Sequence, residues 1–402
     1  MSRFWPALVG LLAAGCLLLP VKAASAHASL VSLDPPPALL AAPPTEVRLI
    51  FSEPVTPFGR GIEVISPSGR RVSGSARASG NALAAAIESG EQGTYRVEWR
   101  VVAQDTHPSR GTYSFSVGHP SPVPAGLTAN GDLGAVAPLG LLLQALARWL
   151  HFLGFALAFG GVAFQLLVLQ APEPGRRLKL LVYAGIALLL AAEPVALVGQ
   201  AASLGSVDSA SLADVLGSAL GRVLALRLAA PLLLWGILGA LRETRGAGAW
   251  AVLALGAGLA WVDGLAGHTI GGQPAVYADA LTAVHVASMT LWVGGVAALL
   301  VVLPGRRDRR ALVARFGTYA LYPLVVLLLS GAILAVAHLK GPGDLVFSSY
   351  GLMLTIKVVA VGAALAAARF GLRSLRSGRP EVLALAGVVA LASLLASLPP
   401  PR

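Results

Sequence analysis

Residues 142–169 read LLQALARWLHFLGFALAFGGVAFQLLVL, an apolar run in which Arg148 is the one charged residue. A run of this length can cross about 30 Å of hydrocarbon as a helix. Further long apolar stretches follow, separated by short loops that are charged or rich in Gly and Pro. The sequence therefore predicts that residues 139–402 form an all-α polytopic membrane bundle of eight helices. The predicted spans are 142–169, 179–202, 219–241, 249–269, 277–303, 312–338, 347–370 and 381–398.

The composition agrees with a membrane protein. The chain has 402 residues and is 56% hydrophobic and 12% charged, whereas soluble domains are roughly 45–50% apolar and about 25% charged. An ordinary soluble enzyme is therefore excluded. The net charge is +11, but residues 27–120 are neutral and the basic excess lies in the apolar residues 121–402. This placement indicates charged loops beside a lipid bilayer and no nucleic-acid partner.

The first residues resemble an export signal. Residues 1–26 contain Arg3, then an apolar run, then Ala24-Ser25-Ala26, which has the small-x-small form of a cleavage site. Cleavage there makes His27 the first residue of the mature chain. Two alternatives are a lipoprotein signal cut before Cys16 and an uncleaved anchor. Cys16 is the only cysteine, so a cleaved chain has no disulfide or thiolate site.

Residues 27–120 are predicted to form an all-β domain, because short β-rich runs alternate with Pro-, Gly- and Ser-rich turns. This pattern is typical of a Greek-key sandwich or barrel of immunoglobulin or cupredoxin type. Residues 121–138, rich in Pro and Gly, are predicted to be a linker. The predicted strands are Val47–Phe51, Gly61–Ile65, Ala82–Ile87, Thr94–Val102 and Thr112–Val117.

The loop charges predict an orientation. If the β domain is exported, the loops after predicted spans one, three, five and seven face the cytoplasm. Lys340 is the only basic residue of the internal loops on the other side. This asymmetry predicts a multi-pass protein of the bacterial inner (cytoplasmic) membrane, with the β domain on the periplasmic or extracellular side. The cytoplasmic loops and their edges contain Arg176, Arg177, Lys179, Arg242, Arg245, Arg306, Arg307, Arg309, Arg310, Arg315, Arg369, Arg373, Arg376 and Arg379.

Ionisable residues inside the spans are costly, so each is a candidate for function or for a buried ion pair. Neutral imidazole is a common ligand of copper and zinc, and four histidines lie toward the predicted outer side. Each of them also fits a hydrogen-bonded packing role. These metal-ligand candidates are His151, His268, His285 and His338, whereas Glu193, Arg222, Arg227 and Lys357 are predicted to form structural ion pairs.

The β domain contains a second set of candidate ligands. A mature chain that begins at His27 offers an amine and an imidazole nitrogen from one residue, the arrangement called a histidine brace. Asp105-Thr106-His107 precedes Pro108 and the last predicted strand. Nitrogen ligands with carboxylate support suit Cu(II). The alternative is that His107 is a surface histidine in a turn.

Several segments resemble known copper proteins. The exported part is similar to CopC, the periplasmic copper-binding β-barrel protein, and the membrane part to CopD, which implies a CopC–CopD fusion. The CopC-like segments are His27-Ala28-Ser29-Leu30, Asp34-Pro35, Leu49–Val55, Tyr95-Arg96-Val97, Asp105-Thr106-His107-Pro108 and Gly111–Phe115. The CopD-like segments are Arg148-Trp149-Leu150-His151, Gly267-His268, His285 to Gly295, and Tyr350-Gly351 with Lys357.

The resemblance implies a set of Cu(II) ligands. Matched residue by residue, they are His27, Glu53, Asp105 and His107. The family commonly has Gly where this chain has Thr106. Some members also have a Met-rich Cu(I) site, which is not expected here because the only methionines are Met1, Met289 and Met353. The membrane histidines are implied only as candidates.

The sequence therefore predicts a copper-binding membrane protein without catalytic residues. Its exported domain would capture Cu(II) and pass it to the membrane domain for uptake or homeostasis, with periplasmic copper carriers as further candidate partners. The alternatives are a membrane oxidoreductase whose intramembrane histidines hold haem or copper, and a copper module for sequestration or sensing. A histidine brace that activates oxygen is a third alternative.

Overall fold

The computed structural model describes residues 30–103, 108–122, 138–171, 174–205, 207–240, 247–265, 275–339 and 343–348, and short pieces between 351 and 362. The predicted signal peptide, His27, Asp105, His107, His268, Lys357 and the predicted span 381–398 lie outside the described residues. The chain divides into two compact units. The first contains the described residues of Ala23–Leu142 and Leu197–Gly221, and the second those of Leu143–Ala196 and Arg222–Arg402.

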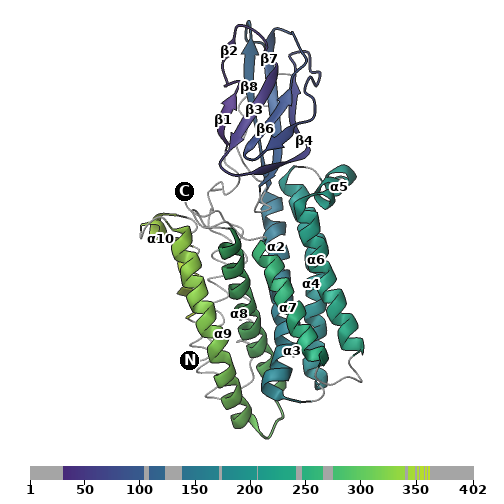
Figure 1. The fold of residues 1–402 in the computed structure, drawn as a ribbon, viewed down its shortest axis with the longest axis vertical. Helices are drawn as coiled ribbons and strands as arrows, with labels where there is room; N and C mark the ends of the chain where they lie inside the picture. The colour runs from purple at the N-terminus through teal and green to yellow at the C-terminus, as the bar shows by residue number, and fades with distance from the viewer. Residues whose placement is uncertain are drawn as a thin grey trace. The chain divides into compact units, whose positions relative to one another are not determined.

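The first unit contains two four-stranded sheets (Figure 1). Sheet A has the strand order β1-β3-β6-β5, and sheet B has the order β2-β8-β7-β4. Neighbouring strands are antiparallel, except that β2 joins β8 in parallel. The strands are β1 Leu30–Asp34, β2 Leu39–Leu40, β3 Glu46–Phe51, β4 Val55–Ile65, β5 Arg77–Ser79, β6 Ala82–Ala86, β7 Gly93–Ala103 and β8 Pro108–Val117.

The core of this unit follows from the alternation of apolar residues. In β3, Val47, Leu49 and Phe51 are buried, whereas Glu46 and Arg48 are exposed. Successive side chains of a strand point to opposite faces, so one face of each sheet supplies the apolar core between them. The same alternation continues in β7, with Val97, Trp99 and Val101 fully or almost fully buried. The prediction of an all-β domain with sandwich-like sheets is confirmed.

Strand β4 contains an irregularity that the sequence prediction missed. Its pairing with β7 shifts register between Pro57 and Ile62, and Gly59 and Gly61 have φ angles of 58° and 73°. A Cβ atom at Gly61 would lie 2.7 Å from the Cβ of Pro57, so this bulge requires glycine. The predicted strand Gly61–Ile65 is therefore the second half of a longer strand that begins at Val55.

From residue 138 onward the described chain is helical (Figure 1). The first long helix contains two π-helical segments, η1 and η2, which follow α2 and α3 without a break. Pro194, Pro231 and Pro323 lie inside α4, α6 and α9. The elements are α2 Pro138–Phe155, η1 Ala156–Gly160, α3 Gly161–Phe164, η2 Gln165–Leu169, α4 Arg176–Ser203, α5 Ser209–Gly217, α6 Ala219–Ala240, α7 Ala247–Leu265, α8 Ala275–Val302, α9 Arg309–His338 and α10 Asp344–Phe347.

Five helices in the described residues are long and apolar enough to cross a membrane. They correspond to the first, second, third, fifth and sixth predicted spans. The fourth predicted span corresponds to α7, whose apolar segment Trp250–Leu265 is shorter. The total of eight spans stays a prediction. The five helices are Pro138–Leu169, Arg176–Ser203, Leu220–Gly239, Val276–Val302 and Arg309–Ala337.

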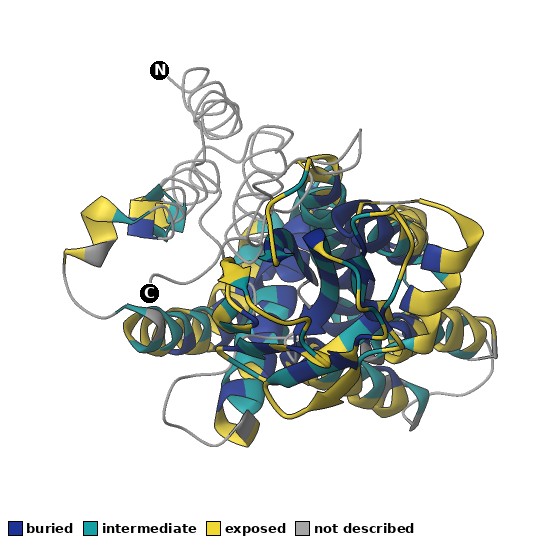
Figure 2. Cartoon of the chain, turned by 90° about the horizontal axis from the view of Figure 1, so that it is seen from above, coloured by how far each residue is buried: buried dark blue, intermediate teal, exposed yellow. Residues whose placement is uncertain are grey.

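Glycines allow the helices of the second unit to pack closely. A Cβ atom at Gly294 of α8 would collide with the carbonyl oxygen of Ala156 in η1, and one at Gly185 of α4 would collide with the backbone nitrogen of Ala158. Small residues at such contacts let helix backbones approach each other, as is common in membrane bundles. Buried residues lie on the inner faces of these helices, and exposed ones on the outer faces (Figure 2).

Candidate functional site

Five strand ends of the first unit meet at one end of the sandwich. Leu30, the first residue of β1, pairs with Phe51, the last residue of β3. Val55, the first residue of β4, pairs with Ala103, the last residue of β7. β8 begins at the same end, because Pro108 pairs with Val102. The crossing from sheet A to sheet B, residues 52–54, therefore lies at the end of the sandwich where β1 and β8 begin and β7 ends.

Glu53 lies in this crossing and is half-buried. It is the one predicted Cu(II) ligand of the β domain that the structure describes. His27, Asp105 and His107 lie outside the described residues, so the ligand set as a whole stays a prediction. Within the described ranges, His, Cys, Asp and Glu form no group of three or more that could hold a metal ion.

The second unit contains a network of charged side chains in its interior. Nδ1 of His151 lies 3.0 Å from Oε1 of Glu193, and Nε2 of His151 lies 3.1 Å from the carboxylate of Asp263. Arg227 donates from Nε to Oδ1 of Asp263 at 2.9 Å. These residues come from α2, α4, α7 and α6, respectively. These polar contacts therefore join four helices. Ionisable side chains inside a membrane bundle are usually paired with one another in this way.

The network is almost completely buried. His151, Glu193 and Asp263 are 2%, 5% and 4% exposed, and Phe152 and Phe155 lie against the His151 ring with centroid distances of 5.5 and 6.3 Å. Burial of charge is costly unless each group is paired. Oε2 of Glu193 is nevertheless buried without a hydrogen-bond partner among the described residues.

The sequence identified most members of this network but not their connections. Glu193 and Arg227 were predicted to form ion pairs, and the structure brings them together with His151. Asp263 was not predicted to pair with either, although a lone carboxylate in an apolar helix is itself a signal for such a partner. Both ring nitrogens of His151 face carboxylates, while the prediction that it binds a metal stays untested.

The other predicted membrane ligands do not join this network in the described residues. Nδ1 of His285 in α8 lies 3.0 Å from Oγ of Ser330 in α9, and this hydroxyl donates to the carbonyl of Val326 at 2.7 Å. His338 is the last residue of α9, and its side chain is not among those described. His268 lies outside the described residues.

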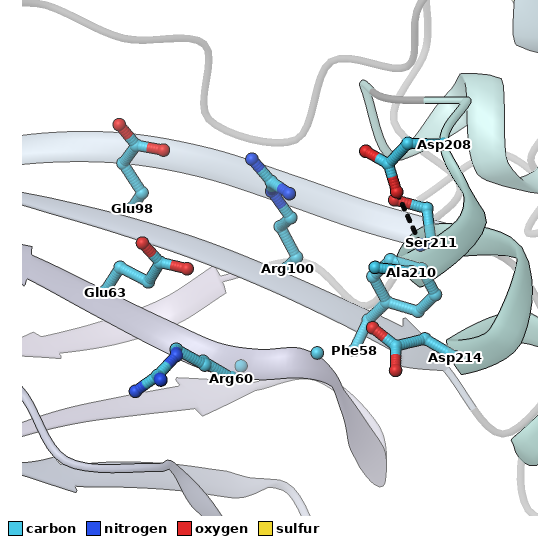
Figure 3. Close-up of a pocket in the computed structure, with 11 residues that line it drawn as sticks. Phe58, Arg60, Glu63, Glu98, Arg100, Asp208, Ala210, Ser211 and Asp214 are labelled. Carbon is cyan, nitrogen blue, oxygen red and sulfur yellow. Dashed lines mark hydrogen bonds between the residues drawn. The ribbon is translucent and has the colours of Figure 1, made fainter.

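A pocket of about 250 Å³ lies in the first unit between sheet B and α5 (Figure 3). Asp208 begins α5 by accepting a hydrogen bond from the backbone nitrogen of Ser211 at 2.8 Å. A Cβ atom at Gly59 would lie 3.3 Å from Oδ2 of Asp214, so α5 closely approaches the bulge of β4. The charged residues of the lining are Arg60, Glu63, Glu98, Arg100, Asp208 and Asp214.

Two family models match the chain one after the other. Residues 30–118 match the CopC domain, and residues 139–276 match the N-terminal domain of copper resistance protein D-like proteins. Copper resistance protein C of Xanthomonas campestris pv. juglandis is 33% identical over 104 residues, which cover 23% of this chain and 82% of that protein. The chain belongs to the copper resistance proteins, with a CopC domain and a CopD-like domain in one chain.

Longer similarity extends over both domains of this CopC–CopD protein. The copper transport protein CutJ of Bacillus subtilis (strain 168) is 26% identical over 364 residues, which cover 84% of this chain and 66% of CutJ. Among solved structures, CopC from Methylosinus trichosporium OB3b is 29% identical and covers 24% of this chain and 98% of its own, with a TM-score of 0.22. The predicted resemblance to a CopC–CopD fusion is confirmed.

Proposed function

We propose that the CopC domain of this protein binds Cu(II) through His27, Glu53, Asp105 and His107, and delivers copper to the CopD-like membrane domain for uptake. The observation that carries this proposal is the meeting of strand ends at one end of the sandwich. His27 precedes Leu30 by three residues, and Asp105 and His107 belong to the four-residue connection between Ala103 and Pro108. At no more than about 3.5 Å per residue, connections this short allow each predicted ligand to reach Glu53.

The donor atoms suit the metal. An amine and imidazole nitrogens with carboxylate oxygens favour Cu(II), which prefers a tetragonal nitrogen and oxygen environment. The amine of His27 is available only after cleavage behind Ala26. The proposal therefore includes an export signal in residues 1–26 and a CopC domain on the periplasmic side of the bacterial inner membrane. Copper is the cargo of this site, and no catalytic step is assigned to it.

The pocket beside α5 supports the delivery step. The segment between the membrane-spanning-capable helices α4 and α6 lies against β4 of the CopC domain, at Gly59 and Asp214. The lining of the pocket contains four carboxylates and two guanidinium groups. The segment that links two of these helices thus contacts the domain that carries the predicted copper ligands.

The test measures copper uptake by the full-length protein in proteoliposomes at limiting Cu(II). Wild-type protein should accumulate copper inside the vesicles, and His27→Ala and His107→Ala should lose most of this uptake. His119→Ala is the matched control, because His119 is an exposed histidine that follows the opposite end of β8. Equal internal copper with and without the wild-type protein would refute transport. Unchanged uptake in both ligand variants would refute the assigned ligands.

A further inference from the structure

The pocket between sheet B and α5 lies wholly within the first unit (Figure 3). In β7, Glu98 and Arg100 alternate with the buried residues Trp99 and Val101. Successive side chains of a strand point to opposite faces, so Glu98 and Arg100 lie on the face of sheet B that points away from the core. Glu63 of β4 pairs with Glu98 in register and lies on the same face. One wall of the pocket is therefore a charged surface of the sheet.

The helix α5 forms the opposite wall. Asp208 and Asp214 approach the sheet from this helix (Figure 3). A Cβ atom at Gly59 would lie 3.3 Å from Oδ2 of Asp214, and the φ angle of Gly59 is 58°. Glycine at the bulge of β4 therefore keeps the space beside this carboxylate open.

Opposite charges face this pocket without pairing with one another. The hydrogen bond drawn in Figure 3 is the one by which Asp208 begins α5. In the part of the chain that the structure describes, no ion pair and no side-chain hydrogen bond is formed by the lining residues Arg60, Glu63, Arg100 and Asp214. These side chains can each pair with a ligand that enters the pocket.

The charges in and beside the pocket balance. The lining contains Arg60 and Arg100 against four carboxylates. Two more arginines adjoin it, namely Arg96, whose Nη2 lies 2.7 Å from Oε1 of Glu98, and Arg110, which pairs with Arg100 in register. A simple cation or anion therefore meets as many like charges as opposite ones. A ligand that carries both charges can find a charge-assisted hydrogen bond for each.

The size and the uncharged part of the lining restrict the ligand further. The pocket volume of about 250 Å³ is below the range of about 300–1,000 Å³ that is typical of sites for drug-sized ligands. Phe58, which is almost fully buried, and Ala210 supply apolar surface (Figure 3). An α-amino acid with a small apolar side chain has one ammonium group, one carboxylate and an apolar part of suitable size.

We propose that this pocket binds a small apolar α-amino acid as a zwitterion. The carboxylate of the ligand pairs with the guanidinium group of Arg100, and its ammonium group pairs with Asp214. Its side chain lies beside Phe58 and Ala210. The bound zwitterion thus connects sheet B to α5. This site requires neither the predicted copper ligands nor copper transport.

The test measures binding of L-alanine to the full-length protein by saturation-transfer NMR. The protein is held in nanodiscs of phosphatidylcholine, whose headgroup has no primary ammonium group. Propionate and ethylamine are the matched probes, because each retains one of the two charged groups of alanine. L-alanine should bind saturably and at least about tenfold more tightly than either probe. Absence of saturable L-alanine binding, or equal affinity for propionate or ethylamine, would overturn the proposal.

Two substitutions test the two walls of the pocket. Arg100→Gln and Asp214→Asn should each weaken L-alanine binding by about tenfold. Arg100→Gln should leave the weak binding of ethylamine unchanged, a selective loss that unfolding would not produce. The controls are Arg71→Gln, at an exposed arginine outside the pocket, and Asp308→Asn, at a partly exposed aspartate of the second unit, and both should bind L-alanine as the wild type does. Unchanged L-alanine affinity in either pocket variant would overturn the proposal, whatever the outcome of copper uptake.

Discussion

At the scale of single residues, Asp263 connects Arg227 to His151 in the buried network. It receives contacts from both His151 and Arg227. Asp263→Asn removes the negative charge that balances Arg227 and leaves this cation, whose side chain is only 14% exposed, uncompensated. Such a loss costs about 3–5 kcal/mol, and we expect it as a lower unfolding free energy in detergent.

The matched control for this substitution is Asp308→Asn. Asp308 pairs with Arg306 at 2.8 Å, and both side chains are partly exposed. An exposed ion pair is worth about 0–1 kcal/mol. If the two variants unfold at the same denaturant concentration, the buried network does not stabilise the bundle.

The exposed pair of Arg70 and Glu91 allows a prediction on pH. Hydrogen bonds from Arg70 and Ser68 hold the pKa of Glu91 at about 2, below its ordinary value of 4.5. A carboxylate with a lowered pKa contributes stability above its unfolded pKa, and the contribution is lost as the pH falls toward the folded value. Arg70→Ala should raise the pKa of Glu91 toward 4.5, as measured by carbon NMR of its carboxyl group. An unchanged pKa would show that Arg70 does not act on Glu91.

The sequence predicts which charged residues need a partner, but not which residues those partners are. Glu193 and Arg227 were expected to find partners because unpaired charges in apolar helices are costly. Their actual partners, His151 and Asp263, depend on which helices are neighbours. The positions 151, 193, 227 and 263 are far apart in the chain, and helical periodicity within each segment does not determine that order.

At the scale of elements, the contact between η1 and α8 depends on glycine. A Cβ atom at Gly294 would collide with the carbonyl oxygen of Ala156. Gly294→Ala should therefore push the two helices apart and lower the unfolding free energy by about 1–3 kcal/mol, the usual cost of overpacking. Gly236→Ala in α6 is the control, since its Cβ would meet no atom within 4 Å. Equal stability of the two variants would contradict the close contact.

Strand and helix positions were predictable where a regular pattern of apolar residues was present. The alternation in β3 and the long apolar runs of α4 and α9 identified these elements. The start of β4 was not identified, because Pro57, Gly59 and Gly61 interrupt the alternation at the bulge. The π-helical segments also escaped prediction, because apolar residues continue through Ala156–Gly160 without a change of composition.

At the scale of the whole molecule, the sequence indicated the order of the domains but not the position of the segment between α4 and α6. That segment belongs to the same compact unit as the β domain, although the two are far apart in the chain. Arg100→Glu adds a carboxylate to a pocket that already contains Asp208 and Asp214. The added repulsion should separate α5 from β4 and slow copper uptake several-fold, with Cu(II) binding unchanged.

Uptake and binding are measured on the same preparation to test this prediction. Arg71→Glu provides the control, because Arg71 is an exposed arginine of the β domain that does not line the pocket. If Arg100→Glu and Arg71→Glu take up copper at equal rates, the contact of α5 with the CopC domain has no part in delivery.

The central claim is that Cu(II) binds at the end of the sandwich where β1, β4 and β8 begin. Electron paramagnetic resonance of the Cu(II)-loaded full-length protein tests it most directly, after sequencing confirms His27 as the first residue. We predict nitrogen coupling from histidine that changes in His27→Ala and in His107→Ala and is unchanged in His119→Ala. A spectrum that is identical in all three variants and in the wild type would contradict the claim.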